Sequence, residues 1–118
     1  MNAVEQKSFL FAVRIVKLCR YLRERKSEWI LTKQLICSGT SIGANVVEAQ
    51  QAQSKADFIA KLSIALKETV ETKYWLRLLK ATEYLSEKES DSMISDCCEL
   101  EKLLTAILKT MKDIKNKT

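Results

Sequence analysis

Ser38-Gly39-Thr40-Ser41-Ile42-Gly43-Ala44-Asn45-Val46-Val47-Glu48-Ala49 is a run of small and polar residues inside a helical pattern. One helical face recurs every three or four positions, at Leu31, Leu35, Ser38, Ile42, Asn45 and Ala49. The two glycines lie one turn apart beside that face. Because glycine costs about 1 kcal/mol relative to alanine inside a helix, they favour close approach of another backbone over a loop that tolerates glycine. We therefore expect close helix packing at Ser38, Gly39, Ile42, Gly43 and Asn45, with hydrogen-bond partners for any buried Ser38 or Asn45 side chain.

Further motifs extend this stretch over nearly the whole chain. They are Gln34-Leu35, Ser38 to Asn45, Glu48-Ala49, Asp57-Phe58-Ile59, Lys61 to Glu68, Glu71-Thr72 and Tyr74 to Leu79. In combination they resemble the small four-helix-bundle family encoded in intervening sequences of bacterial 23S ribosomal RNA genes. The resemblance implies an antiparallel bundle that assembles as a homopentameric ring. It also implies a distant likeness to the basic accessory protein of diversity-generating retroelements, which is thought to engage nucleic acid and a reverse transcriptase.

One position departs from this family pattern. The residue before Ser38 is commonly basic in the family, and in this chain it is Cys37. A ligand contact attributed to that basic side chain therefore does not carry over to this protein.

Composition and periodicity indicate a single all-α domain. The 118 residues are 47% hydrophobic and 30% charged, with no proline and two glycines, which is typical of a helical protein. We predict an antiparallel up-down four-helix bundle with helices at 4–24, 28–51, 55–82 and 87–115. Serines are the predicted N-caps of the last three helices: Ser27, Ser54 in a capping box with Asp57, and Ser86 in a capping box with Glu89.

Several classes of site are missing from the sequence. Without histidine, neither a Ser-His-Asp triad, nor a Glu-x-x-His di-iron site, nor a zinc site of the usual kinds can form. Phosphate-binding glycine loops and dinucleotide fingerprints are also absent. We therefore predict no catalytic residues, no cofactor and no metal site, and a protein that is not an enzyme. The four cysteines, which lack Cys-x-x-Cys spacing, are interpreted as reduced structural thiols: Cys19, Cys37, Cys97 and Cys98.

The start of the chain and its hydropathy predict a soluble cytoplasmic protein. Residues 1–5 carry no basic region followed by a cleavable apolar segment. No uncharged apolar run approaches the roughly 20 residues that a membrane span needs. We therefore expect no membrane contact.

The first predicted helix carries two apolar stripes. One stripe, suited to the core, consists of Phe11, Ile15, Leu18 and Leu22. The other, on a well-separated part of the circumference, consists of Phe9, Val13 and Val16. A lone bundle needs only the first stripe, and monomers rarely expose large apolar patches. We therefore predict that the second stripe contacts another subunit.

A second predicted oligomer interface lies on the third helix. It consists of Ile64, Glu68, Glu71 and Trp75. The two carboxylates lie beside an indole on a face that should be partly buried. We expect them to pair with a basic group of a neighbouring helix or subunit, with Arg14 and Arg77 as candidates, because ion-pair networks often resemble active sites.

The net charge of +5 is unevenly distributed along the chain. Segments 1–29, 55–82 and 102–118 are net basic, and 83–101 is net acidic. The helix dipole accounts for the acidic start and basic end of the fourth helix, but not for cations along the first and third helices. The candidate nucleic-acid-binding residues are Arg14, Lys17, Arg20, Arg23, Lys102, Lys109 and Lys112. In the fourth helix the three lysines lie opposite a heptad seam formed by Met93, Cys97, Leu100, Leu104, Ile107, Met111 and Ile114.

Two functions remain open at this point. The protein is either an oligomeric module that binds RNA or DNA through phosphate contacts, or an oligomeric adaptor whose apolar and acidic faces hold a protein partner. No RNA-recognition or helix-turn-helix signature is visible, so binding to a specific base sequence is not expected. The family resemblance favours nucleic-acid binding.

Overall fold

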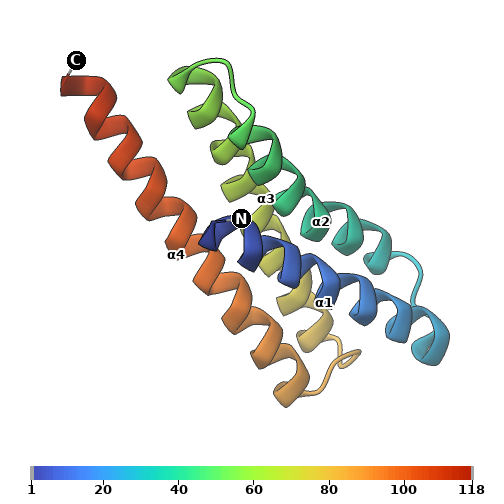
Figure 1. Ribbon diagram of the computed structural model, residues 1–118. Helices are drawn as coiled ribbons and strands as arrows, with labels where there is room; N and C mark the ends of the chain where they lie inside the picture. The colour runs from blue at the N-terminus through green and yellow to red at the C-terminus, as the bar shows by residue number, and fades with distance from the viewer. Residues whose placement is uncertain (1, 118) are drawn as a thin grey trace.

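The computed structural model describes the backbone of residues 2–117 and the side chains of residues 2–114. Its helices are α1 (Ala3–Lys26), α2 (Leu31–Gln50), α3 (Lys55–Ala81) and α4 (Glu87–Lys117). Consecutive helices run in opposite directions and form an elongated bundle of 52 × 22 × 22 Å (Figure 1). The predicted all-α four-helix fold is confirmed, since residues 2–117 contain no strand.

One face of every helix enters a common core. The predicted inner stripe of α1 is buried at Phe11, Ile15 and Leu22 and half-buried at Leu18. The predicted seam of α4 is buried from Met93 to Leu104, but it does not stay in the core to its end, since Ile114 is 41% exposed. The last turns of α4 therefore carry apolar side chains that the rest of the chain does not fully cover.

The two glycines of α2 face α1. A Cβ atom on Gly39 would lie 2.8 Å from both Cγ1 and Cγ2 of Ile15. A Cβ atom on Gly43 would lie 3.4 Å from the backbone carbonyl oxygen of Ser8. Both glycines therefore lie against α1, with the tighter contact at Gly39. Another backbone is the near neighbour only at Gly43, whereas at Gly39 the neighbour is a buried side chain.

The polar residues of this stretch have the partners that burial requires. Ser38 is buried, and its hydroxyl lies 2.9 Å from the Thr72 hydroxyl of α3 and 3.3 Å from the Leu35 carbonyl. Asn45 is half-buried and donates from its side chain to the Ser41 carbonyl at 2.8 Å. The small side chains of α2 therefore allow contact with α1 on one side and with α3 on the other.

Both predicted capping serines of α3 and α4 are in place. Ser54 accepts a hydrogen bond from the backbone N–H of Asp57 at 3.0 Å, but the Asp57 carboxylate accepts from the Gln53 N–H at 3.4 Å, so the predicted box is not reciprocal. Ser86 and Glu89 form a reciprocal capping box, with both bonds at 3.1 Å. These local signals were sufficient because a serine hydroxyl satisfies a free N–H group of the first helical turn.

The predicted start of α2 is wrong. Ser27 is the C-cap of α1, in the left-handed conformation with φ 53°, and it does not cap α2. Glu28 provides the cap instead. Its carboxylate accepts hydrogen bonds from the backbone N–H groups of Ile30, Leu31 and Thr32 at 3.1, 2.7 and 2.9 Å. Helix α2 therefore begins at Leu31 rather than at residue 28.

Candidate assembly and nucleic-acid surfaces

The second apolar stripe of α1 lies on the surface. Phe9 is 60% exposed and Val16 is 37% exposed, while Val13 is half-buried. Phe9 also lines a groove between α1 and α2, whose α2 side includes Ala44 and Val47. Val47 is itself 55% exposed. The apolar surface thus continues from α1 onto α2 and is larger than the sequence pattern of α1 alone indicated.

The predicted interface on α3 is partly buried and lacks polar partners. Glu68 and Trp75 are half-buried, whereas Ile64 and Glu71 are exposed. The indole Nε1–H of Trp75 is buried and has no hydrogen-bond partner among the described residues. Burial, and secondarily the neighbouring charge of Glu71, raises the pKa of Glu68 above its usual value. This face therefore contains a buried donor without a partner among the described residues and an acid whose charged form is disfavoured.

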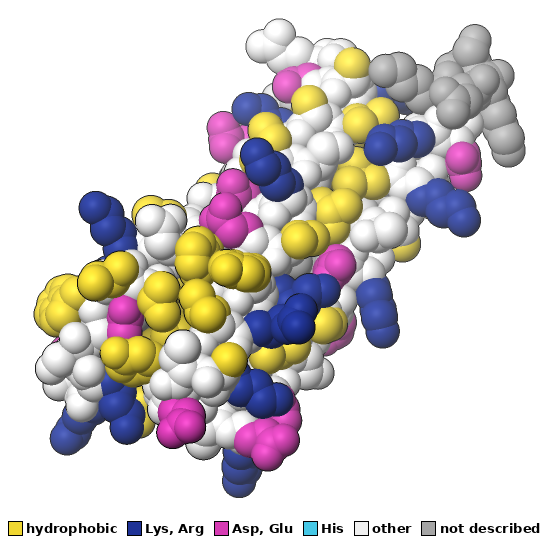
Figure 2. All heavy atoms as spheres, turned by 180° about the vertical axis from the view of Figure 1, so that it is seen from behind, with side chains coloured by type: hydrophobic (Ala, Val, Ile, Leu, Met, Phe, Trp, Pro, Cys, Tyr) yellow, Lys and Arg dark blue, Asp and Glu magenta, His cyan; other side chains and the backbone are white. Residues whose placement is uncertain are grey.

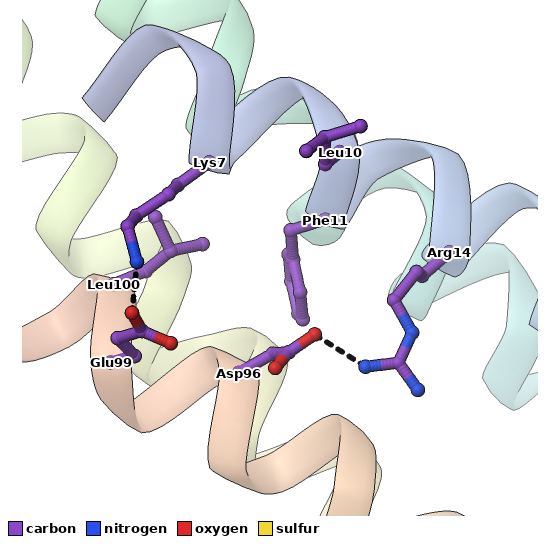
Figure 3. A pocket seen from close by; sticks show the side chains of 7 residues that line it. All are labelled: Lys7, Leu10, Phe11, Arg14, Asp96, Glu99 and Leu100. Atoms are coloured by element: carbon purple, nitrogen blue, oxygen red, sulfur yellow. Dashed lines mark hydrogen bonds and ion pairs between the residues drawn. The ribbon is translucent and has the colours of Figure 1, made fainter. Parts of the chain in front are cut away.

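Arg14 points to α4 and not to these acids. It forms an ion pair with Asp96 and donates a hydrogen bond to the Ser92 hydroxyl at 2.9 Å. Lys7 forms a similar ion pair with Glu99 one turn further along α4. Figure 3 shows both cations reaching from α1 to α4, with the Phe11 ring between the two pairs.

The prediction that Arg14 neutralises Glu68 or Glu71 inside one chain is therefore wrong. Arg77 is exposed, and among the side chains of residues 2–114 neither acid has an ion pair with a basic group. A partner from a neighbouring subunit stays a prediction.

The basic residues of α1 gather at the end of the bundle that carries the α1–α2 and α3–α4 turns. Lys17 and Arg20 are exposed, and Lys17 lines an open groove with Arg14, Tyr21 and Lys88. The glutamate Glu89 lies in the same groove and offsets part of this charge. Because Arg14 is already paired with Asp96, Lys17 and Lys88 are the cations that exceed the charge of Glu89, and the groove is only weakly basic.

Two of the lysines proposed on α4, Lys109 and Lys112, lie toward the other end of the molecule, whereas Lys102 lies midway along α4. Lys102, Lys109 and Lys112 are all exposed, as predicted. The ion pair between Lys7 and Glu99 sets the register of α1 against α4. At a rise of 1.5 Å per residue, Arg20 and Lys112 are then about 40 Å apart along the bundle axis. The seven candidate residues therefore do not form one surface, since the basic residues of α1 and the pair Lys109 and Lys112 are separated along the bundle.

Sequence reasoning missed the aromatic residue at the α1–α2 turn as a surface feature. Trp29 is 62% exposed and Ile30 is 80% exposed. The guanidinium carbon of Arg23 lies 5.2 Å from the centre of the Trp29 ring, and its Nε donates to the Thr32 hydroxyl at 2.9 Å. Arg23 is therefore held in the turn and is less available than Arg20. The basic residues that precede Trp29 in the sequence were the signal that could have identified this surface.

The cysteines are unpaired and differ in accessibility. Cys19 and Cys97 are buried, and desolvation raises the pKa of their thiols to about 11 and about 12. The neighbouring Cys98 is half-buried and Cys37 is exposed. Thiols with pKa values this high are protonated near neutral pH, so Cys19 and Cys97 act as small apolar side chains.

The described residues contain no group of cysteine, aspartate or glutamate side chains that could hold a metal ion. None of their helices is sufficiently long and apolar to cross a membrane.

Residues 1–106 match the family model for the 23S rRNA-intervening sequence protein. A similar solved structure is that of a protein of unknown function from the S23 ribosomal protein family of Bacteroides thetaiotaomicron. The two sequences are 53% identical, and the structures superimpose with a TM-score of 0.90 over 91% of this chain and 99% of the other. No curated protein matches the chain.

Proposed function

The chain belongs to the 23S rRNA-intervening sequence protein family, and on that premise we propose that it is a non-catalytic, cytoplasmic homo-oligomer that binds nucleic acid without base specificity. Its ligand would be structured RNA or DNA, held through phosphate contacts. The observation that carries the proposal is the pair of exposed basic surfaces at opposite ends of an elongated bundle. Repeating two such surfaces in every subunit multiplies a modest charge per chain.

Oligomerisation is supported by two different apolar faces on one chain. The first is the α1 stripe with Phe9 and Val16, and the second is the α3 face with Ile64 and Trp75. When two unlike faces meet, the contact is head-to-tail, and head-to-tail contacts produce closed rings if the rotation between subunits closes. A homopentameric ring is the form that we propose.

The binding proposal is tested by titrating labelled structured RNA, and then duplex DNA, with nucleic-acid-free protein over a salt series. We expect log affinity to fall linearly with log salt, with a slope of about −0.9 for each duplex phosphate that is contacted. Alanine at Lys17, Lys109 or Lys112 should reduce that slope. Absence of binding at low salt would contradict the proposal.

The assembly proposal is tested by changing Val13 and Val16 together to glutamate and measuring native mass. The variant should be monomeric with unchanged helicity, because two charges would be desolvated in the interface. The matched control adds two glutamates at Thr105 and Thr110, which are exposed on α4. If the double valine variant keeps the native mass of the parent, the α1 stripe is not the interface.

An adaptor role is the second candidate. It is favoured by the α3 face, where the exposed Ile64 and Glu71 lie with the half-buried Glu68, whose pKa is raised, so that an apolar side chain and acids are available to a protein ligand. A ring that binds no nucleic acid at any salt concentration would support this role over the first.

A further inference from the structure

The α1–α2 turn is rigidly built by its own side chains. Glu28 is only 5% exposed, and its carboxylate is saturated by the backbone N–H groups of residues 30–32. The Glu28 N–H in turn donates to the Leu22 carbonyl at 3.1 Å, which closes the end of α1. The acid of the turn is therefore used internally, and it presents little negative charge to solvent.

The same backbone path places Trp29 and Ile30 outside the bundle. Arg23 covers one face of the indole, at 5.2 Å from the ring centre. Since Trp29 keeps 62% of its surface exposed, the opposite face of the ring is open to solvent. The hydrogen bond to the Thr32 hydroxyl fixes Arg23, and Arg23 in turn holds the Trp29 ring. The ring is therefore ordered before a ligand binds, and binding costs little side-chain entropy there.

Exposed cations precede and follow Trp29 in the chain. They are Arg20, Arg25, Lys26 and Lys33, none of which forms an ion pair within the described residues. The exposed acid of the same segment is Glu24, and Lys26 also lines a groove with Glu83, Glu87 and Glu89 near the start of α4. Figure 2 shows Lys and Arg side chains at this end of the molecule, with Asp and Glu side chains between them.

We propose that the α1–α2 turn is a stacking platform for an unpaired nucleobase of single-stranded nucleic acid. The base stacks on the open face of Trp29, and flanking phosphates contact Arg25, Lys26 and Lys33. Aromatic stacking accepts any base, because every base has a π-face, and it is available only where the strand is unpaired. This inference rests on the proposed nucleic-acid function and assigns the single-stranded part of the ligand to one end of the bundle.

A single strand is favoured over a lipid surface or a protein by the composition of the turn. The apolar contribution consists of two side chains, one of which already carries a guanidinium on its face. That is a small area for membrane insertion or for the core of a protein interface. A flat ring with exposed cations before and after it in the chain matches instead the alternation of bases and phosphates along a strand.

The test uses tryptophan fluorescence in a full-length Trp75→Phe background, in which Trp29 is the remaining tryptophan. Phenylalanine removes no hydrogen bond there, because the Trp75 Nε1–H has no partner in the described chain. An oligouridine of about ten nucleotides should quench the emission of Trp29, since site sizes of single-strand modules are in this range. A fully paired RNA duplex should bind with much less quenching.

Affinity measurements on variants complete the test. Trp29→Ala should weaken oligouridine binding about tenfold at unchanged salt slope, because it removes stacking and no charge. Lys26→Ala should lower the slope by about 0.7, the value for one single-strand phosphate. The matched control is Tyr74→Ala, which removes a ring that is 57% exposed on α3 and should alter neither quantity. Circular dichroism confirms that each variant is folded.

The possible results distinguish the Trp29 stacking platform from the proposed nucleic-acid-binding function. If oligouridine binds with a salt slope but neither quenches Trp29 nor responds to Trp29→Ala, the platform is overturned while the proposed function stands. If no RNA or DNA binds at low salt, both are overturned. If phosphatidylcholine–phosphatidylglycerol vesicles shift the emission of Trp29 and oligouridine does not, the turn is a lipid contact and the platform is wrong.

Discussion

Helix α1 is held by its two neighbours in different ways. Its contact with α2 is extensive and passes through buried side chains and two glycines, whereas its contact with α4 is much smaller. The α1–α4 contact is edged by ion pairs in which every side chain is between 39% and 57% exposed. Exposed ion pairs contribute about 0–1 kcal/mol, and overpacking a tight core contact costs about 1–3 kcal/mol or more. The position of α1 therefore depends mainly on α2.

Gly39→Leu should have the largest effect on the α1–α2 contact. Even the Cβ atom would lie 2.8 Å from two atoms of Ile15, which is fully buried and stiff because it is β-branched. We expect the free energy of unfolding to fall by about 3 kcal/mol or more, measured by urea denaturation and circular dichroism. The control is Ala44→Leu, at an exposed position of the same helix. Equal urea midpoints for the two variants would contradict tight packing at Gly39.

Glu28→Ala should have the next largest effect, at the turn where α1 meets α2. It removes the acceptor of three backbone N–H groups, so we expect a loss of about 1–2 kcal/mol in unfolding free energy. Glu28→Gln keeps one acceptor oxygen and should lose less. Ser27→Ala should cost little, because Ser27 ends α1 and does not cap α2. The reverse order of the Ser27 and Glu28 effects, measured by thermal unfolding, would restore the sequence-based assignment.

The helices and the glycine contact could be predicted because they depend on local sequence. Helical spacing, the Ser54 and Ser86 caps, and a pair of glycines one turn apart each act within a few residues. The start of α2 could not be predicted in the same way. Ser27 and Glu28 are neighbours and both can cap a helix, and the choice follows from the left-handed backbone of Ser27 that closes α1.

The surfaces could be predicted only in part. Exposure of the α1 stripe and of Lys102 follows from helical geometry alone. The partner of Arg14 does not, because Asp96 is 82 positions away and the pairing depends on how α4 is aligned against α1. The same alignment separates the basic residues of α1 from Lys109 and Lys112 of α4 along the bundle. The sequence positions of these cations do not give this alignment, so the sequence could not show that they form separate surfaces. The exposure of Trp29 could not be predicted either, because it depends on the buried Glu28 cap.

A smaller effect is expected on the α1–α4 side. A double-mutant cycle with Arg14→Ala and Asp96→Ala should give a coupling of about 0.5 kcal/mol, because both side chains are about two-fifths exposed. Raising the salt concentration should reduce this coupling, measured from urea midpoints of the four proteins. Arg20→Ala with Asp96→Ala is the uncoupled control. A coupling of several kcal/mol that is independent of salt would mean that α4 holds α1 as firmly as α2 does.

Gly43→Ala should have the smallest effect, with the opposite sign to Gly39→Ala. At Gly43 a Cβ atom would lie 3.4 Å from the Ser8 carbonyl oxygen, which is an ordinary contact distance. Alanine then adds helix propensity without a clash, so unfolding free energy should rise by up to about 1 kcal/mol. Gly39→Ala gains the same propensity but forces Ile15 to move, and should lower it. If both alanine variants are destabilised equally in urea, a Cβ atom is accommodated as poorly beside the Ser8 backbone at Gly43 as beside the Ile15 side chain at Gly39. The α1–α2 contact would then be uniformly tight rather than concentrated at Ile15.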